Sequence, residues 1–236
     1  MNVGDYAKAR EMYKKQIALN GFDELSQTRL RSCVFVDTAK TYETIYDVIN
    51  AQTINSRYSD FSPSPYREKV VLATSRFDAD SIVYTYTGDG FEDLYETYYN
   101  LEQNTWSPIS KLQGEINSTY NDGTFSFDQR TQTAYFMQCN GVSGAEKNCN
   151  IYTSKFNSES ATWAKPQAFE YFTTEYSSGH PVITSDGLTL YFSSNNPAGI
   201  GGTDIWMCHK DSVNGKWSAP SNLGTMINTK GDEMFP

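Results

Sequence analysis

The sequence offers few groups for catalysis or for metal binding. It has only two histidines, His180 and His209, and four cysteines among 236 residues. It contains no Gly-x-Ser-x-Gly segment, which would mark a hydrolase nucleophile. The one glycine-rich loop, residues 199–204, lacks the Gly-x-Gly-x-x-Gly pattern of a dinucleotide site. The nine residues between Cys139 and Cys149, with no histidine close by, do not fit zinc-ligand spacing. The sequence therefore predicts no catalytic residue, no metal and no cofactor.

Long apolar runs and basic runs are also absent. No stretch approaches the ~18 apolar residues that a membrane-spanning helix needs. Residues 1–6 lack the charged and apolar regions of a signal peptide, so we expect any leader to lie outside this chain. Lys and Arg number 19 against 28 Asp and Glu, which gives a net charge of -9. An acidic surface repels phosphate, so nucleic acid is an unfavourable partner.

Aromatic residues are abundant, and three tryptophan segments recur. Aromatics make up 14% of the chain, a composition that favours strands over helix bundles. Trp106, Trp163 and Trp217 lie 57 and 54 residues apart, and each is followed six positions later by an apolar residue. A fixed period of this length indicates a repeat architecture. Such a regular position predicts one packing role per repeat for each tryptophan, in preference to a sugar-stacking series.

Two further markers recur in the same order. One is a strand opener before each tryptophan, at residues 93–95, 150–152 and 204–206. The other is an Ile-Asn-Ser/Thr segment, which we call the Ile-Asn motif, at residues 54–60, 116–122 and 227–233. Each repeat contains four short apolar runs separated by turns, the pattern of a four-stranded antiparallel blade. Residues 54–236 are therefore predicted to form a mainly β, partial β-propeller, with sheets related by rotation about a common axis.

The N-terminal residues follow a different pattern. Apolar residues at helical spacing predict a short α-helical segment over residues 1–45, with Asp5 as its first cap and Asn20-Gly21 as its end. Asp23 or Ser26 could open a second helix. Two helices followed by strands indicate two segments, with a boundary near residues 41–55. At the other end, Pro236 aligns with Pro63 at the start of a blade. Propellers have typically 4–8 blades, so we expect this chain to be a fragment of a longer one.

The most distinctive segment is residues 181–194, followed by Gly201-Gly202-Thr203-Asp204-Ile205-Trp206. It resembles the TolB-like, WD-repeat-like propeller motif. Its coupling to the tryptophan segment and the Ile-Asn motif resembles envelope proteins of the Bacteroidota. In those proteins tetratricopeptide helices precede the propeller and an OmpA-like domain follows it, a PorE-like layout found in type IX secretion. Residues 4–13 are similar to the second helix of a tetratricopeptide repeat.

This resemblance implies a non-enzymatic scaffold in a bacterial cell-envelope assembly. It implies a periplasmic, outer-membrane-associated location and protein partners in the envelope. Peptidoglycan would be bound only through a domain that is not in this chain. Two alternatives stay open from the residues themselves. One is the accessory propeller domain of a hydrolase or peptidase, and the other is a carbohydrate- or peptide-binding module.

The cysteines suggest one covalent link. If the strands that end at Cys139 and begin at Cys149 pair as a hairpin, the two residues can face each other and form a disulfide. Closing a loop of about ten residues would stabilise the fold by roughly 2–3 kcal/mol. The alternative is two free thiols. Similar cysteine pairs in the propellers that this chain resembles favour the disulfide. Cys33 is interpreted as a buried apolar residue, and adjacent Cys208 and His209 should point to opposite faces of a strand.

The remaining candidates are acidic and histidine positions. Carboxylates gather at Asp78/Asp80, Asp89 and Glu92/Asp93, which favours a solvated loop over a glycosidase pair. Calcium at Asp78 and Asp80 would lack the EF-hand pattern. His180 precedes Pro181 and is interpreted as a loop or cap residue. Residues 185–189 are similar to the Asp box of sialidases, but Leu190 replaces its tryptophan, and such boxes are structural turns.

Overall fold

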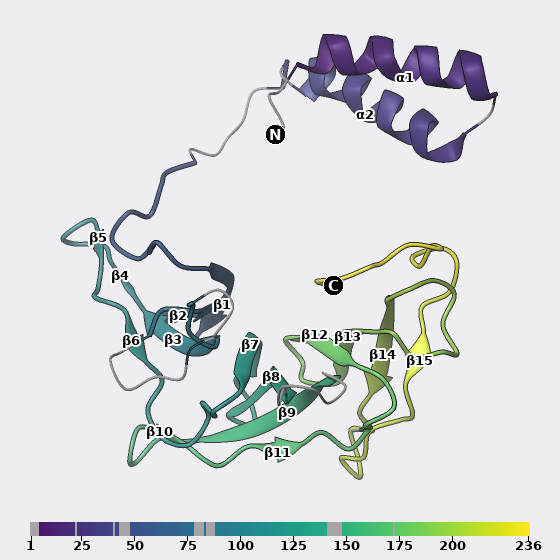
Figure 1. The fold of residues 1–236 in the computed structure, drawn as a ribbon. Coiled ribbons are helices and arrows are strands. Elements are labelled where there is room, and N and C mark those ends of the chain that lie inside the picture. Colours follow the sequence, from purple (N-terminus) through teal and green to yellow (C-terminus); the bar gives the residue numbers. More distant parts are fainter. Residues whose placement is uncertain are drawn as a thin grey trace. The chain divides into compact units, whose positions relative to one another are not determined.

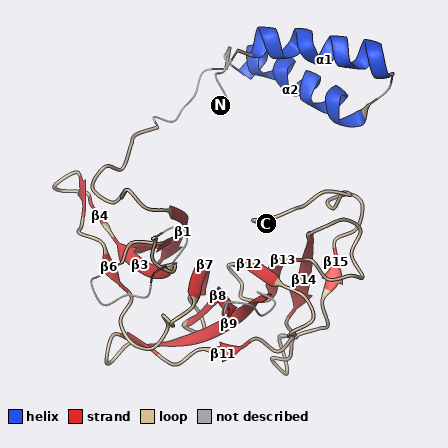
Figure 2. Ribbon diagram, viewed as in Figure 1, coloured by secondary structure: helices blue, strands red, loops and turns tan. Residues whose placement is uncertain are grey.

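The computed structural model describes residues 5–21, 23–39, 41–42, 48–77, 83, 88–140, 148–171 and 173–236. The chain divides into two compact units, Met1–Asn50 and Ala51–Pro236. The first is helical and the second is built from strands (Figure 2). Each unit has its own internal packing.

The first unit is a pair of helices, α1 (Tyr6–Asn20) and α2 (Glu24–Ala39). The Asp5 carboxylate accepts a hydrogen bond from the Lys8 amide at 3.0 Å and caps α1. The Asp23 carboxylate accepts a hydrogen bond from the Ser26 amide at 3.2 Å, so Asp23 caps the start of α2. Arg10 of α1 forms an ion pair with Asp37 of α2, which holds the helices together. Among the described residues, no helix is both long enough and apolar enough to cross a membrane.

The second unit consists of antiparallel sheets that follow one another along the chain (Figure 1). The first sheet has the order β1 (Asp60–Tyr66), β2 (Lys69–Thr74), β3 (Asp93–Thr97) and β6 (Ser110–Lys111). The second contains β7 (Asn121–Asp128), β8 (Thr133–Asn140) and β9 (Asn148–Asn157), with β10 (Thr162–Trp163) and β11 (Gln167–Ala168) both paired to β9. The third has the order β12 (Ser178–Ile183), β13 (Thr189–Ser194), β14 (Asp204–His209) and β15 (Ser221–Asn222).

The repeat extends to individual strand pairs. In the first repeat, Trp106 pairs with Tyr99 between the short strands β4 (Tyr99–Asn100) and β5 (Thr105–Trp106). In the second, Trp163 pairs with Phe156, and in the third, Trp217 forms a bridge with Lys210. A two-residue strand begins four residues after each tryptophan, as β6, β11 and β15. The sequence period therefore corresponds to a repeated strand arrangement.

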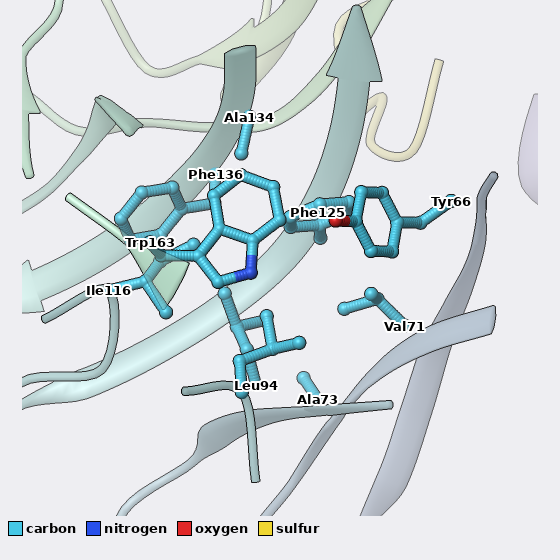
Figure 3. Close-up of a cluster of buried hydrophobic side chains, with 10 residues drawn as sticks. Tyr66, Val71, Ala73, Leu94, Ile116, Phe125, Ala134, Phe136 and Trp163 are labelled. Carbon is cyan, nitrogen blue, oxygen red and sulfur yellow. The ribbon is translucent and has the colours of Figure 1, made fainter. Parts of the chain in front are cut away.

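Two apolar cores lie between successive sheets. The core between the first and second sheets includes Tyr66, Leu94, Phe136 and Trp163, and Figure 3 shows these side chains converging on the indole. The core between the second and third sheets is built around Leu190, Phe192 and Trp206, with other buried residues. Neighbouring sheets are thus joined by shared apolar packing.

The asparagine of the Ile-Asn motif bonds to the third strand of the sheet that precedes it in the chain. The Asn117 side chain accepts from the Leu94 amide at 2.7 Å and donates to the Leu94 carbonyl at 3.1 Å. Asn228 makes the same two bonds to Ile205, at 2.8 and 3.0 Å. An asparagine amide has both a donor and an acceptor, so it can replace a missing neighbouring strand over one residue. This is the physical reason for the asparagine in two of the motif's three occurrences.

The acidic residue that ends the motif binds the amide of the motif's Ser or Thr. Asp60 accepts from the Ser56 amide, Asp122 from the Ser118 amide and Glu233 from the Thr229 amide. Burial raises the pKa of Asp60, but hydrogen bonds from Thr74, Arg76 and Ser56 outweigh it, so its pKa is lowered. For Asp122, burial dominates over its bonds to Gln138 and Ser118 and raises its pKa to about 6. The pKa values of these equivalent carboxylates therefore shift in opposite directions, because burial dominates at Asp122 whereas the hydrogen bonds and the Arg76 ion pair dominate at Asp60.

The Asp122 carboxyl predicts a pH dependence of stability. Its folded pKa lies above the ordinary aspartate value of 3.8, so folding favours the protonated form. This contribution is fully present below pH 3.8 and is lost as the pH rises towards 6, by about 3 kcal/mol in total. Asp122→Asn resembles the protonated form, so its unfolding free energy relative to the wild type should rise over that interval. Urea denaturation of both proteins at pH 4, 5, 6 and 7 measures this difference. A difference that does not change with pH would contradict the prediction.

Cys139 of β8 and Cys149 of β9 face each other in register and form a disulfide. Their Cα atoms are 4.0 Å apart. The bond links the second and third strands of the second sheet at the ends that adjoin residues 141–147. The other two cysteines, Cys33 and Cys208, are free and buried.

Candidate functional site

A groove lies along the first strands of the three sheets. It has a volume of about 580 Å³ and is lined by β1, β7 and β12, together with Phe235 and Pro236 near the C-terminus. We call it the inner groove. The volume falls within the ~300–1,000 Å³ that is usual for small-molecule sites. Strand β7 lies beside both β1 and β12, and the Ile183 amide of β12 donates to the Ser126 hydroxyl of β7 at 3.0 Å. The walls are therefore held by direct contacts between sheets.

Each of the first strands carries a bulge at the groove. The strand register shifts between Phe61 and Ser64, between Gly123 and Phe125, and between Gly179 and Val182. Within these bulges Ser62, Thr124 and His180 have positive φ angles of 52°, 37° and 50°. Phe235 also has a positive φ, of 59°, and lines the same groove. Left-handed backbone is unfavourable for residues other than glycine and is concentrated at functional sites. We refer to Ser62, Thr124, His180 and Phe235 as the bulge residues, although Phe235 lies outside the strands and shares only the backbone conformation of the other three.

The groove has mainly apolar walls and no charged side chain. Its polar side chains are hydroxyls, one amide and one imidazole, on Ser62, Ser64, Thr124, Ser126, Gln129, His180 and Ser185. The remainder of its lining is apolar, from Pro63, Pro65, Phe125, Phe127, Pro181, Val182, Ile183, Phe235 and Pro236. Within the described part of the chain, no acidic or basic side chain lines it. A charged ligand would lose its hydration there without gaining a counter-charge.

Thr124 presents an unused hydroxyl at the groove. The residue is only 3% exposed, and its Oγ1 has no hydrogen-bond partner among the described residues. Leaving a buried hydroxyl unpaired costs roughly 1–3 kcal/mol. Most buried polar groups in folded proteins are paired, so this exception at the edge of a groove marks a position where a ligand could supply the missing partner.

The tautomer of His180 follows from its neighbours. The Ser193 hydroxyl donates its single hydrogen to the Gly179 carbonyl at 3.2 Å. His180 Nδ1 lies 2.7 Å from the same hydroxyl, and both contacts are satisfied together only when Nδ1 donates to Ser193. Burial lowers the pKa of His180, so the ring is neutral at pH 7. A neutral ring with its proton on Nδ1 leaves Nε2 as a hydrogen-bond acceptor. The Phe235 ring lies against this imidazole, with the ring centroids 4.0 Å apart.

The other sequence candidates lie away from this groove. Asp93 forms an ion pair with Lys111 at 2.6 Å, and burial raises the pKa of Glu92. Asp78 and Asp80 lie outside the described residues. Cys208 is fully buried and burial raises the pKa of its thiol to about 12, whereas His209 is exposed. Cys208 and His209 therefore do not form a thiolate–imidazole pair.

The three tryptophans differ in environment. Trp163 is 3% exposed and belongs to the first core. Trp217 is partly buried and packs against the second core. Trp106 is half-buried and contacts Tyr99 with a centroid distance of 5.1 Å. None of the three lines the inner groove.

Sequence reasoning missed the groove, although a signal for it was present. His180 was interpreted as a loop or cap residue, and Thr124 and Ser62 were not singled out. Three of the four bulge residues precede a proline, at Ser62-Pro63, His180-Pro181 and Phe235-Pro236. A proline at the same place in successive repeats could have indicated a repeated backbone feature. It could not have indicated a left-handed residue before each proline, since that conformation depends on the bulge.

No protein-family model and no curated protein sequence matches this chain. Similar solved structures include the catalytic domain of a GH62 α-L-arabinofuranosidase from Coprinopsis cinerea, with a TM-score of 0.43, 12% identity, and coverage of 74% of this chain and 53% of that chain. An α-L-arabinanase from Cellvibrio cellulosa has a TM-score of 0.40, 12% identity, and coverage of 74% and 60%. TolB from Acinetobacter baumannii has a TM-score of 0.37, 16% identity, and coverage of 70% and 33%.

These similarities concern architecture alone. The chain spans between about a third and about three fifths of the length of these three structures. The identities are low, and the common element is a propeller-like arrangement of antiparallel sheets. The fold of the second unit is mainly β and propeller-like. A PorE-like, OmpA-family or type IX secretion assignment gains no support from them.

The prediction of a non-enzymatic envelope scaffold is contradicted. Most of the similar structures are glycoside hydrolases or sialidases, which go against both the scaffold role and the prediction that the chain is not an enzyme. The error has a physical reason. The repeat residues on which the resemblance rested maintain the sheets, and a propeller can carry many unrelated functions.

Proposed function

We propose that the second unit is a propeller domain of the hydrolase type and that its inner groove is the ligand-binding site. In this proposal each sheet is a four-stranded blade, with β1, β7 and β12 as the innermost strands. The observation that carries it is the set of bulge residues, three of them in the bulges of β1, β7 and β12, lining one groove of about 580 Å³. Bulges occur preferentially next to active sites, where they redirect a side chain.

Two features of the groove support a binding role. Its mixture of apolar walls and a few polar groups is the usual composition of a small-molecule site. Its walls are also fixed before any ligand arrives, because Ser126 bonds β7 to β12 and Ser193 holds the His180 ring. Such prior organisation lowers the entropic cost of binding.

Filling the groove should abolish ligand binding without unfolding the protein. Val182 lines the groove and is 39% exposed, so Val182→Trp would occupy the ligand's space with little disturbance of either core. The matched control is Val213→Trp, because Val213 lies in a turn and is 93% exposed. We expect members of a fragment library to bind the wild type and V213W but not V182W in ligand-observed NMR. The proposal is wrong if V182W retains the same set of bound fragments.

A further inference from the structure

The inner groove presents hydrogen-bonding groups that select for one kind of ligand. Thr124 Oγ1 is buried without a partner and can both donate and accept. His180 Nε2 can only accept, because Nδ1 carries the proton that bonds to Ser193. A ligand that pairs with both must supply at least one donor. Carboxylate and phosphate oxygens are acceptors only, so anionic groups of this kind cannot satisfy the imidazole.

The surroundings of these two groups exclude charge of either sign. No acidic or basic side chain lines the groove within the described residues. A cationic donor such as an ammonium group would therefore be desolvated without a counter-ion. The ligand that fits is neutral and carries hydroxyl groups.

The aromatic and proline residues add a flat apolar surface. Phe235 is 60% exposed, and one side of its ring lies against the His180 imidazole. Pro63, Pro181 and Pro236 also line the groove. A saccharide ring has hydroxyls at its rim and an apolar face of C–H groups. It can satisfy the hydrogen-bonding groups and the apolar surface together, which a flexible neutral polyol or a peptide backbone does less completely.

We propose that the inner groove binds a neutral saccharide, with sugar hydroxyls bonded to Thr124 Oγ1 and His180 Nε2 and the sugar ring packed against Phe235. This inference rests on the proposed function, since it names the ligand class of the same groove. It assigns Thr124 and His180 as specificity-determining residues. The remaining bulge residue, Ser62, contributes a third hydroxyl to the same lining.

Two substitutions remove one recognition group each and leave the fold in place. Thr124→Val removes a hydroxyl that has no partner in the free protein, so thermal stability should be unchanged or slightly higher. Thr124→Ser keeps the hydroxyl and is its control. His180→Asn suits the left-handed backbone, since asparagine tolerates positive φ. Its side-chain amide can donate to Ser193 in place of Nδ1, while the Nε2 acceptor is lost.

The test is isothermal titration of the full chain with maltotriose, xylotriose and arabinotriose. Sialyllactose serves as the anionic comparison and an end-blocked Ala-Ser-Ala tripeptide as the peptide comparison. We expect at least one neutral trisaccharide to bind, at least a fivefold loss of affinity in both T124V and H180N, and wild-type affinity in T124S. Both comparison ligands should fail to bind.

The other outcomes separate this inference from the proposed function. If no neutral trisaccharide binds, the saccharide inference is overturned. If the tripeptide or sialyllactose binds with the same sensitivity to T124V and H180N, the saccharide inference is also overturned, but the groove remains the binding site. If a trisaccharide binds equally well to the wild type, T124V, H180N and V182W, both the inference and the proposed function are overturned.

Discussion

Replacing Trp163 by alanine is expected to lower the free energy of unfolding by about 3–5 kcal/mol, the range for a large aromatic residue in a packed core. The Trp163 ring lies 5.0–5.9 Å from the rings of Tyr66, Phe125, Phe127 and Phe156. Its removal would therefore leave a cavity between the first and second sheets (Figure 3). Urea denaturation monitored by circular dichroism measures the loss.

The repeat supplies the control for this experiment. Trp106 occupies the same place in the preceding repeat, but it is half-buried and its aromatic neighbour is Tyr99. Trp106→Ala should cost only about 1 kcal/mol. Equal losses of unfolding free energy in W163A and W106A would contradict the prediction that the more deeply buried tryptophan contributes more to stability.

The backbone around Trp163 limits how the site can adjust. Its amide donates to the Gln113 carbonyl and its carbonyl accepts from the Glu115 amide, both at 2.9 Å. Gly114, between those two residues, has a φ of 102°, and a Cβ there would lie 2.3 Å from the Trp163 carbonyl oxygen. The main chain at position 163 is thus held on both sides. Collapse of neighbouring residues into the cavity is restricted, which places the expected loss towards the upper end of the range.

Replacing Asn228 by alanine should cost about 2–4 kcal/mol, because it leaves the Ile205 amide and carbonyl without partners in a buried place. Asn228 is 2% exposed and bonds to both groups. Its side chain also donates to Asn222 at 2.8 Å. Thermal and urea denaturation of the variant would measure the change.

Asn228→Asp separates the two halves of this interaction. A carboxylate can still accept from the Ile205 amide but cannot donate to the Ile205 carbonyl, and its charge is buried. A loss at least as large as that of the alanine variant is therefore expected. Asn214→Ala, in an exposed turn, is the neutral control. A loss below about 1 kcal/mol in N228A would contradict the role assigned to the asparagine.

The repeat was predictable from the sequence because it rests on local requirements. The tryptophan segment, the strand opener and the Ile-Asn motif each mark a recurring bond or pairing, such as the bonds of Asn117 and Asn228 to a third strand. The difference in burial between Trp163 and Trp106 could not be predicted from such local requirements. It depends on which side chains of the neighbouring sheet reach each indole, and spacing within one repeat does not contain that information.

The candidate site was less accessible to sequence reasoning than the fold. Thr124 and Phe235 both lie eight residues after the isoleucine of an Ile-Asn motif, but they differ in residue type, and no such motif precedes His180. What they share is a left-handed backbone, which for Thr124 and His180 belongs to a bulge that becomes visible only when the strands are paired. The function prediction failed for a related reason, since the residues that identify the sheets are different from those that line the groove.

The shared backbone position of Ser62, Thr124, His180 and Phe235 has a consequence for how this site could evolve. Each of the three sheets offers one side chain to the groove from a bulge of its own, and Phe235 adds a fourth, so a single codon change alters one contact and leaves the other three unchanged. Gene segments encoding whole repeats could be duplicated or exchanged, and each would bring its own contact residue into the same place. New ligand preferences could then arise by reassortment of existing repeats, without any change in the backbone fold.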